Sequence, residues 1–285
     1  MAIIFAFSCL FFSALNDFVF KMFANRVRSR GTFVFLIGVC WLALTFWLPF
    51  SAENRILPTI FWGLISGFFS VAGNILLIEA MGMQSAGLCS TIYRLNLVLV
   101  VVGAVLLLGE TLGPLQILGI LSSLLAILAF MPGRDELHLR VNSRAVLGFQ
   151  LVLIAAALRA GMGLSYKYAF THGADKNMVT LINAGMWIAG GLLYALWREK
   201  KLAWRDRGVL TYGLLSGVLV TLIVFFMAGM LNHSDGAATI VLPIAQMSFL
   251  LTFALGAIFL GEKVSKRKIF ALACGCLAIA LLVLG

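Results

Sequence analysis

Charge is what this sequence lacks most. Asp, Glu, Lys and Arg together make up 11% of the 285 residues, and only 11 residues are acidic. In an ordinary soluble domain about a quarter of the residues are charged. Hydrophobic residues account for 62% of the chain, and the mean hydropathy is +1.06. A soluble protein of this composition could not cover its own surface with polar groups, so the sequence predicts an integral membrane protein.

Histidine and cysteine are also rare, and neither is placed for chemistry. The three histidines fall in or beside predicted loops, and the five cysteines fall inside apolar runs, where free cysteine behaves as a small buried hydrophobe. No spacing fits a zinc site or a disulfide framework. None of the motifs HExxH, GxSxG or the P-loop occurs. We therefore expect no metal, no cofactor and no enzymatic activity.

Long apolar runs fill most of the chain and predict an all-α membrane protein. Backbone amides in lipid must be satisfied internally, which leaves helices or a closed barrel, and runs without strict alternation exclude the barrel. At about 20 residues for each crossing, the chain accommodates ten transmembrane helices. We place them at 2–24, 32–50, 56–80, 86–109, 114–131, 145–170, 177–197, 208–231, 236–260 and 268–285.

The basic residues predict the orientation of these helices. Of the 21 Lys and Arg residues, fifteen fall in odd-numbered connections and two, Arg55 and Lys176, in even-numbered ones. Connections rich in Lys and Arg stay in the cytoplasm, so both termini are predicted outside, in a multi-pass protein of the cell (inner or plasma) membrane. The formal net charge of +10 is explained by this bias and does not indicate nucleic acid.

The second half of the chain repeats the first. Segments 86–130 and 238–282 align without a gap at an offset of 152, and the pairs Gly109-Glu110 and Gly261-Glu262 coincide. We interpret these four residues as structural elbows: Gly ends one helix, and Glu lies before the next helix N-terminus, where free amides favour a carboxylate.

An odd number of helices per half means that the halves insert in opposite directions. The fold prediction is therefore two inverted five-helix repeats, 1–133 and 145–285, joined by a cytoplasmic linker at 134–144. Inverted repeats that meet at the midplane are a recurrent transporter architecture.

The repeated segments carry a family resemblance. The runs LLLGETLGPLQILGILSSLLAIL and IFLGEKVSKRKIFALACGCLAIALLVL resemble the C-terminal helix pairs of the two EamA domains of the drug/metabolite transporter superfamily. Lys21, Lys167 and Pro243 also fit that pattern, although Thr91 stands at the position aligned with Pro243. The resemblance implies a ten-helix transporter with a central cavity lined by helices one, three, four, six, eight and nine, in a family that carries amino acids and other metabolites.

Polar side chains within the predicted spans are the candidate site. An ionised group near the bilayer centre costs about 2.5–3.5 kcal/mol, so such groups face the bundle interior and pair or bind. Asp17 and Glu79 are candidate proton carriers. The alternative is internal pairing, for which Asp17 and Lys21 have the right i, i+4 spacing. The predicted cavity residues are Asn16, Asp17, Asn74, Tyr93, Arg94, Asn96, Arg159, Tyr166 and Gln246.

These features predict a secondary transporter. The two arginines in otherwise neutral spans, Arg94 and Arg159, favour a zwitterionic or anionic substrate such as an amino acid, because a guanidinium fork matches an oxyanion. We expect an exporter that works by alternating access around a midplane cavity. The expected partners are a small-molecule substrate, the lipid bilayer and protons. A membrane-embedded enzyme and a non-transporting membrane receptor remain the alternatives.

Overall fold

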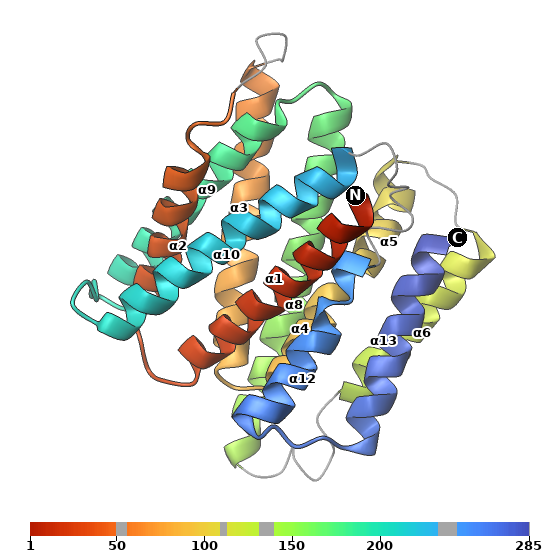
Figure 1. Ribbon diagram of the computed structural model, residues 1–285. Helices are drawn as coiled ribbons and strands as arrows, with labels where there is room; N and C mark the ends of the chain where they lie inside the picture. Colours follow the sequence, from red (N-terminus) through yellow and green to blue (C-terminus); the bar gives the residue numbers. More distant parts are fainter. Residues whose placement is uncertain (50–55, 109–112, 131–139, 233–243, 285) are drawn as a thin grey trace.

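The computed structural model describes residues 1–49, 56–108, 113–130, 140–232 and 244–284, and within these ranges it contains helices and no strand (Figure 1). The first half of the chain forms α1 (Ala2–Ala24), α2 (Arg30–Thr45), α3 (Ile56–Met81), α4 (Ala86–Arg94), α5 (Asn96–Leu108) and α6 (Pro114–Phe130). The second half forms α8 (Arg140–Thr171), α9 (Lys176–Trp197), α10 (Arg207–Asn232), α12 (Ser248–Leu260) and α13 (Lys266–Leu284). The predicted all-α, ten-span fold is confirmed.

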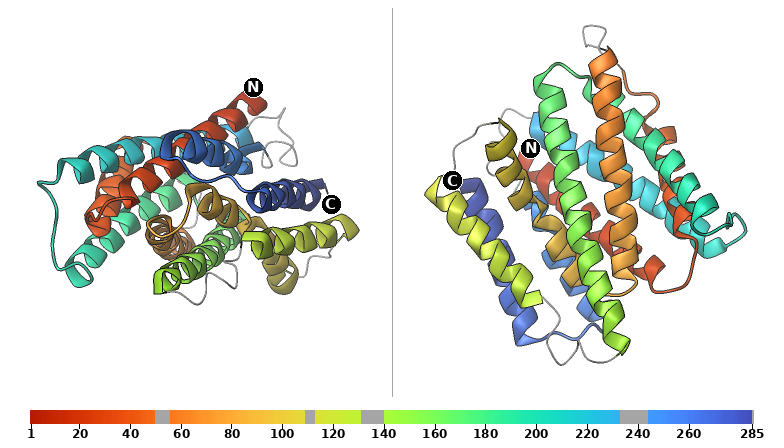
Figure 2. Two further views of the ribbon diagram at one scale, coloured as in Figure 1. Left: turned by 90° about the horizontal axis from the view of Figure 1, so that it is seen from below. Right: turned by 180° about the vertical axis from the view of Figure 1, so that it is seen from behind.

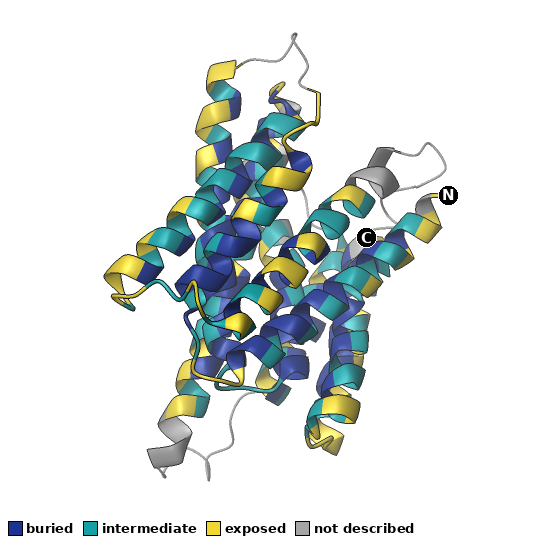
Figure 3. Cartoon of the chain, turned by 60° about the vertical axis from the view of Figure 1, so that its left-hand side comes forward, coloured by how far each residue is buried: buried dark blue, intermediate teal, exposed yellow. Residues whose placement is uncertain are grey.

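The helices are apolar on their outer faces as well as inside. Five of them are long and apolar enough to cross a membrane: Ile3–Ala24, Ile56–Met81, Arg144–Phe170, Lys176–Trp197 and Arg207–Met227. Large side chains such as Phe7, Phe68 and Leu193 are more than half exposed, and Figure 3 shows that the exposed positions follow the outward faces of the helices. An apolar surface of this extent is suited to lipid contact.

The fourth predicted span is not one continuous helix. It divides at Leu95, whose backbone angles (φ −71°, ψ 1°) separate α4 from α5. The ninth span shows the same break at Met247 (φ −73°, ψ 7°), just before α12. Leu95 and Met247 are 152 residues apart, the offset of the sequence repeat, so the interruption is shared by both halves.

One predicted boundary also differs. Helix α8 begins at Arg140, inside the predicted linker 134–144 and before the predicted span 145–170. Charged and polar residues at 140–144 extend the helix beyond its apolar part, as helices do at a membrane surface. Residues 131–139, the rest of the linker, lie outside the described residues, as does Pro243.

The helix packing has the inverted two-fold pattern. Helix α2 packs on α9 and α6 on α13, so each of these pairs joins equivalent helices of the two halves. Helix α4 packs on α12, which belongs to the equivalent span but lies on the other side of its break. The remaining large contacts come in matched sets: α1 with α10 and α3 with α8, then α2 with α10 and α3 with α9. In Figures 1 and 2 the α6–α13 pair lies beside the other helices rather than among them.

Glycine brings the backbones of α2 and α9 into direct contact. A Cβ at Gly191 would lie 2.3 Å from the amide nitrogen of Phe35, and a Cβ at Gly31 would lie 2.3 Å from that of Ala195. No side chain can move to relieve such a clash, because the obstacle is backbone. Small residues at helix interfaces permit this approach in membranes.

One contact between the halves fixes the short helix α4. The carboxylate of Glu262, just past the end of α12, accepts a 2.6 Å hydrogen bond from the amide of Ala86 at the α4 N-terminus. The sequence interpretation assigned Glu262 to the helix that follows it; the structure assigns it to a helix of the other half. Free amides and the helix dipole favour a carboxylate at this position. Beside it, the Lys21 ammonium donates to the carbonyls of Met81 and Gln84, both at 2.7 Å.

We expect Gly191→Val to separate α2 from α9 and to destabilise the protein by about 1–3 kcal/mol, the usual cost of overpacking. Gly185→Val on the same helix is the matched control, because a Cβ at Gly185 meets nothing within 4 Å. Thermal unfolding in detergent measures the difference, and equal melting temperatures for the two variants would contradict the packing described here.

We expect Glu262→Gln to loosen α4, because a neutral amide replaces the carboxylate at a helix N-terminus, at a cost of about 1 kcal/mol, or about a fivefold change in local opening. Cys89 on α4 is fully buried and reports opening through its maleimide labelling rate once the other four cysteines are replaced. The exposed neighbour Lys263→Gln is the control. An unchanged labelling rate in Glu262→Gln would show that the contact does not hold α4.

Candidate functional site

A cavity lies in the middle of the bundle, between the two halves. About 660 Å³ of space free of protein atoms lies there, part of it open to solvent. Helices α1, α2, α3 and α4 contribute from the first half, and α8, α9 and α10 from the second. Seven of the predicted residues line it: Asn16, Asp17, Asn74, Tyr93, Arg94, Arg159 and Tyr166.

Asp17 and Arg94 form a buried ion pair in this cavity. An Asp17 oxygen lies 3.4 Å from an Arg94 guanidinium nitrogen, and the two side chains are 5% and 12% exposed. Ser90 donates a 2.7 Å hydrogen bond to the same oxygen. The i, i+4 partner considered for Asp17 was Lys21, but Lys21 binds backbone carbonyls instead. Charge pairing is therefore between α1 and α4 rather than along α1.

Arg159 has no such partner. Among the described residues, the two ion pairs are Arg94–Asp17 and Arg30–Glu79. The polar contact of the Arg159 side chain is a guanidinium nitrogen 3.4 Å from the Met162 sulfur, a weak acceptor, and the guanidinium carbon lies 5.8 Å from the centre of the Tyr93 ring. Arg159 thus brings an unneutralised positive charge to the cavity.

Hydrogen bonds between helices hold the remaining polar lining. Ser70 on α3 accepts from the Trp187 indole at 2.9 Å, and its carbonyl accepts from the Asn74 amide at 2.8 Å. Asn183 donates to the Tyr166 hydroxyl, and Ser216 donates to Asn16. These bonds fix the orientation of side chains that line the cavity.

Two predicted cavity residues lie elsewhere. Asn96 begins α5 and is buried, and Gln246 precedes the break at Met247; neither lines the cavity. Gln246 is aligned with Arg94, but its side-chain oxygen has no hydrogen-bond partner. Asn96 and Gln246 are polar residues within predicted spans, but the sequence does not show which side of a span faces the cavity. The packing of the helices decides that.

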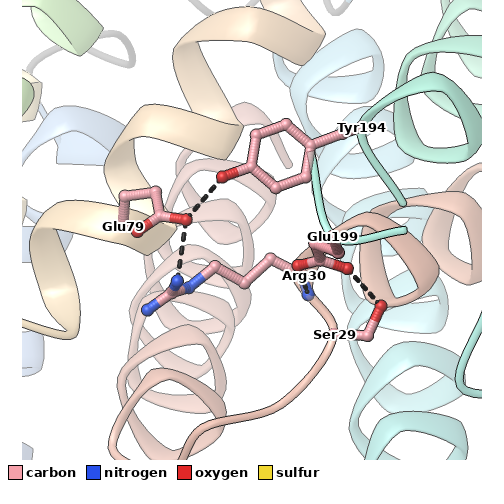
Figure 4. A network of polar contacts seen from close by, with 5 residues as sticks. All are labelled: Ser29, Arg30, Glu79, Tyr194 and Glu199. Carbon is pink, nitrogen blue, oxygen red and sulfur yellow. Dashed lines mark hydrogen bonds and ion pairs between the residues drawn. The ribbon is translucent and has the colours of Figure 1, made fainter. Parts of the chain in front are cut away.

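Glu79 belongs to a separate polar network. It accepts from an Arg30 guanidinium nitrogen and from the Tyr194 hydroxyl, both at 2.7 Å, while Glu199 accepts from Ser29 and from the Arg30 amide (Figure 4). The network joins the N-terminal end of α2, the C-terminal end of α3 and the end of α9, and it does not reach the cavity. The contacts of Glu79 with Arg30 and Tyr194 account for the charged groups of this network. No role in proton transport is needed to explain them.

The elbow residues are described only in the second half. Gly261 has φ +63° and ends α12 in the left-handed conformation, which glycine adopts without a side-chain clash. Glu262 binds the α4 N-terminus as described above. Gly109 and Glu110 lie outside the described residues.

Several lining residues had no signal in the sequence. Trp41 and Trp187 meet edge to face with ring centroids 6.0 Å apart, and α10 contributes the apolar wall of Val220, Ile223, Val224 and Met227. An aromatic or aliphatic residue in an apolar span resembles any lipid-facing residue, so charge alone could not identify them. Over the described part of the chain, no group of three or more His, Cys, Asp or Glu residues is placed to hold a metal.

Comparisons with known proteins agree with this architecture. The model of the EamA-like transporter family matches residues 1–131 and 146–284, so two copies cover nearly the whole chain. A solved crystal structure, described only as that of a protein, superposes with a TM-score of 0.64 at 16% identity over 99% of this chain and 97% of that chain; at that identity it shows the fold alone. No curated protein sequence matches the chain.

We expect Asp17→Asn to destabilise the protein by about 3–5 kcal/mol, because it leaves the Arg94 guanidinium buried without a counter-charge. The double variant Asp17→Asn/Arg94→Gln removes both charges and should unfold at a higher temperature than Asp17→Asn alone. Melting temperatures in detergent test this, and purely additive losses would mean that the two groups are not coupled.

Proposed function

This chain belongs to the EamA-like transporter family, and from that premise we propose that it is a secondary transporter of a small polar metabolite with an anionic or zwitterionic group. The observation that carries the proposal is the unpaired Arg159 in a cavity between the two halves. Arg159 is partly buried, and an ionised side chain within a membrane span usually pairs or binds a ligand. A substrate anion would supply the missing counter-charge.

Alternating access is the proposed mechanism. The contacts of Lys21, Glu79 and Glu262 join helix ends on the side where the Lys- and Arg-rich connections lie, and we infer that this side is cytoplasmic. Breaking them would open the cavity to that side. The breaks at Leu95 and Met247 supply positions where half-helices can tilt independently, as in transporters with discontinuous helices.

Export across the cell membrane is the proposed direction, coupled to a gradient. Asp17 is the proposed proton site because it is the acidic residue in the cavity lining. Protonation of Asp17 would release Arg94 from its ion pair and so change the charge that faces the substrate. Glu79, outside the cavity, is not part of this proposal.

Proteoliposomes loaded with radiolabelled organic acids and amino acids test the function. We expect efflux of at least one compound from vesicles with wild-type protein, and a loss of about tenfold or more with Arg159→Gln, because a charge-assisted hydrogen bond contributes about 1.5–3 kcal/mol. Lys176→Gln, distant from the cavity lining, is the control. Efflux that is equal with and without protein for every compound would reject a transport function.

A further inference from the structure

The cavity presents hydrogen-bond donors without acceptors. The indole nitrogen of Trp41 and the hydroxyl of Tyr93 are buried without a hydrogen-bond partner, and each residue is only 4% exposed. Both residues line the cavity together with Arg159. Buried polar groups in native structures are almost always bonded, so an unpaired group here needs an explanation. A bound ligand supplies one.

The chemistry of the three side chains specifies that ligand. An indole nitrogen and a guanidinium can only donate, and a phenol donates in preference when it faces an anion. The guanidinium carbon of Arg159 lies 5.8 Å from the Tyr93 ring centre, so the two groups serve one region of the cavity. Trp41 adds a third donor to the same cavity lining, which suits a group with several acceptor oxygens.

The charge balance limits the ligand further. The ionisable lining residues are Asp17, Arg94 and Arg159, and the first two neutralise each other across 3.4 Å. One positive charge remains, so the complementary ligand is a monoanion.

The acidic residue in the cavity lining, Asp17, is already paired with Arg94, so a ligand ammonium would have to compete with that guanidinium. One oxygen of Asp17 receives Ser90 and Arg94, and the Asn16 oxygen receives Ser216. The opposite wall, on α10, consists of Val220, Ile223, Val224 and Met227. That wall is suited to an apolar body and offers no charge.

We propose that the substrate is a monocarboxylate with an apolar body, its oxygens bound by Trp41, Tyr93 and Arg159 and its body against α10. This inference rests on the proposed transport function and narrows it from zwitterionic or anionic compounds to anions. Trp41 and Tyr93 are thereby assigned as specificity-determining residues.

Three compounds that share one aliphatic skeleton test the assignment: 4-methylpentanoate, leucine and 3-methylbutylamine. Binding to the purified protein in detergent is measured by calorimetry. We expect the carboxylate to bind at least about tenfold more tightly than leucine, and the amine most weakly, because only the carboxylate matches the single positive charge. Preference for the amine or for leucine, or no binding of any of the three, overturns the inference.

Variants that remove one hydrogen-bond donor locate the site. Trp41→Phe and Tyr93→Phe remove one donor each and should weaken carboxylate binding by about tenfold to hundredfold. Trp187→Phe should weaken it less, because that indole already donates to Ser70, and Trp204→Phe, outside the lining, should not change it. Unchanged affinity in both donor variants, with wild-type melting temperatures, overturns the assignment.

Efflux assays on the same panel separate this inference from the transport function. Carboxylate binding without movement across proteoliposomes would reject transport and leave the binding site standing. Movement of leucine or the amine, unaffected by Trp41→Phe, would reject the monocarboxylate and leave transport standing.

Discussion

The cost of an ionised group away from water constrains this molecule more than any other interaction. Few charges lie within the spans, and among those whose side chains the structure describes, all but Arg159 have a charged or carbonyl partner. Asp17 and Arg94 neutralise each other between α1 and α4, and Lys21 is held by two carbonyls at the end of α3. Arg159 stands apart, with a thioether and an aromatic face as its neighbours. In a membrane protein such an exception is a stronger indication of a binding site than the cavity itself.

Hydrophobicity predicts the spans of this chain well because each crossing needs a similar length of apolar residues. The Gly-Glu elbow predicts the repeat, and the odd number of helices in each half predicts the inversion. Side-chain direction and partners are less predictable. Asp17 pairs with a residue 77 positions away, whereas the local rule offered Lys21. Glu262 binds a helix of the opposite half. Local sequence rules do not predict this contact, because it depends on how α4 and α12 cross in three dimensions. Trp41 carries no charge to mark it, so its unsatisfied nitrogen becomes visible only when the helices are packed.

The contacts between the halves are of two kinds: one holds the helices in a fixed arrangement, and the other can be broken. The α2–α9 interface, with backbone against backbone at Gly31 and Gly191, leaves no room for side chains to rearrange and is suited to a fixed scaffold. The polar contacts between the halves at the helix ends involve the single carboxylates of Glu262, Glu79 and Glu199, which exchange for water at modest cost. A transporter needs both kinds, since one must persist while the other is broken in each cycle.

The interruption shared by Leu95 and Met247 has a consequence for how a guest molecule is oriented. Duplication has preserved the bend in both copies, yet the residue before it is Arg94 in one and Gln246 in the other. The backbone therefore has an approximate two-fold symmetry that the side chains do not share. A symmetric cavity would bind its substrate in either of two reversed orientations. This cavity has its unpaired charged residue on one side only. A substrate held in one orientation therefore leaves with one end leading through one mouth and with the other end leading through the opposite mouth.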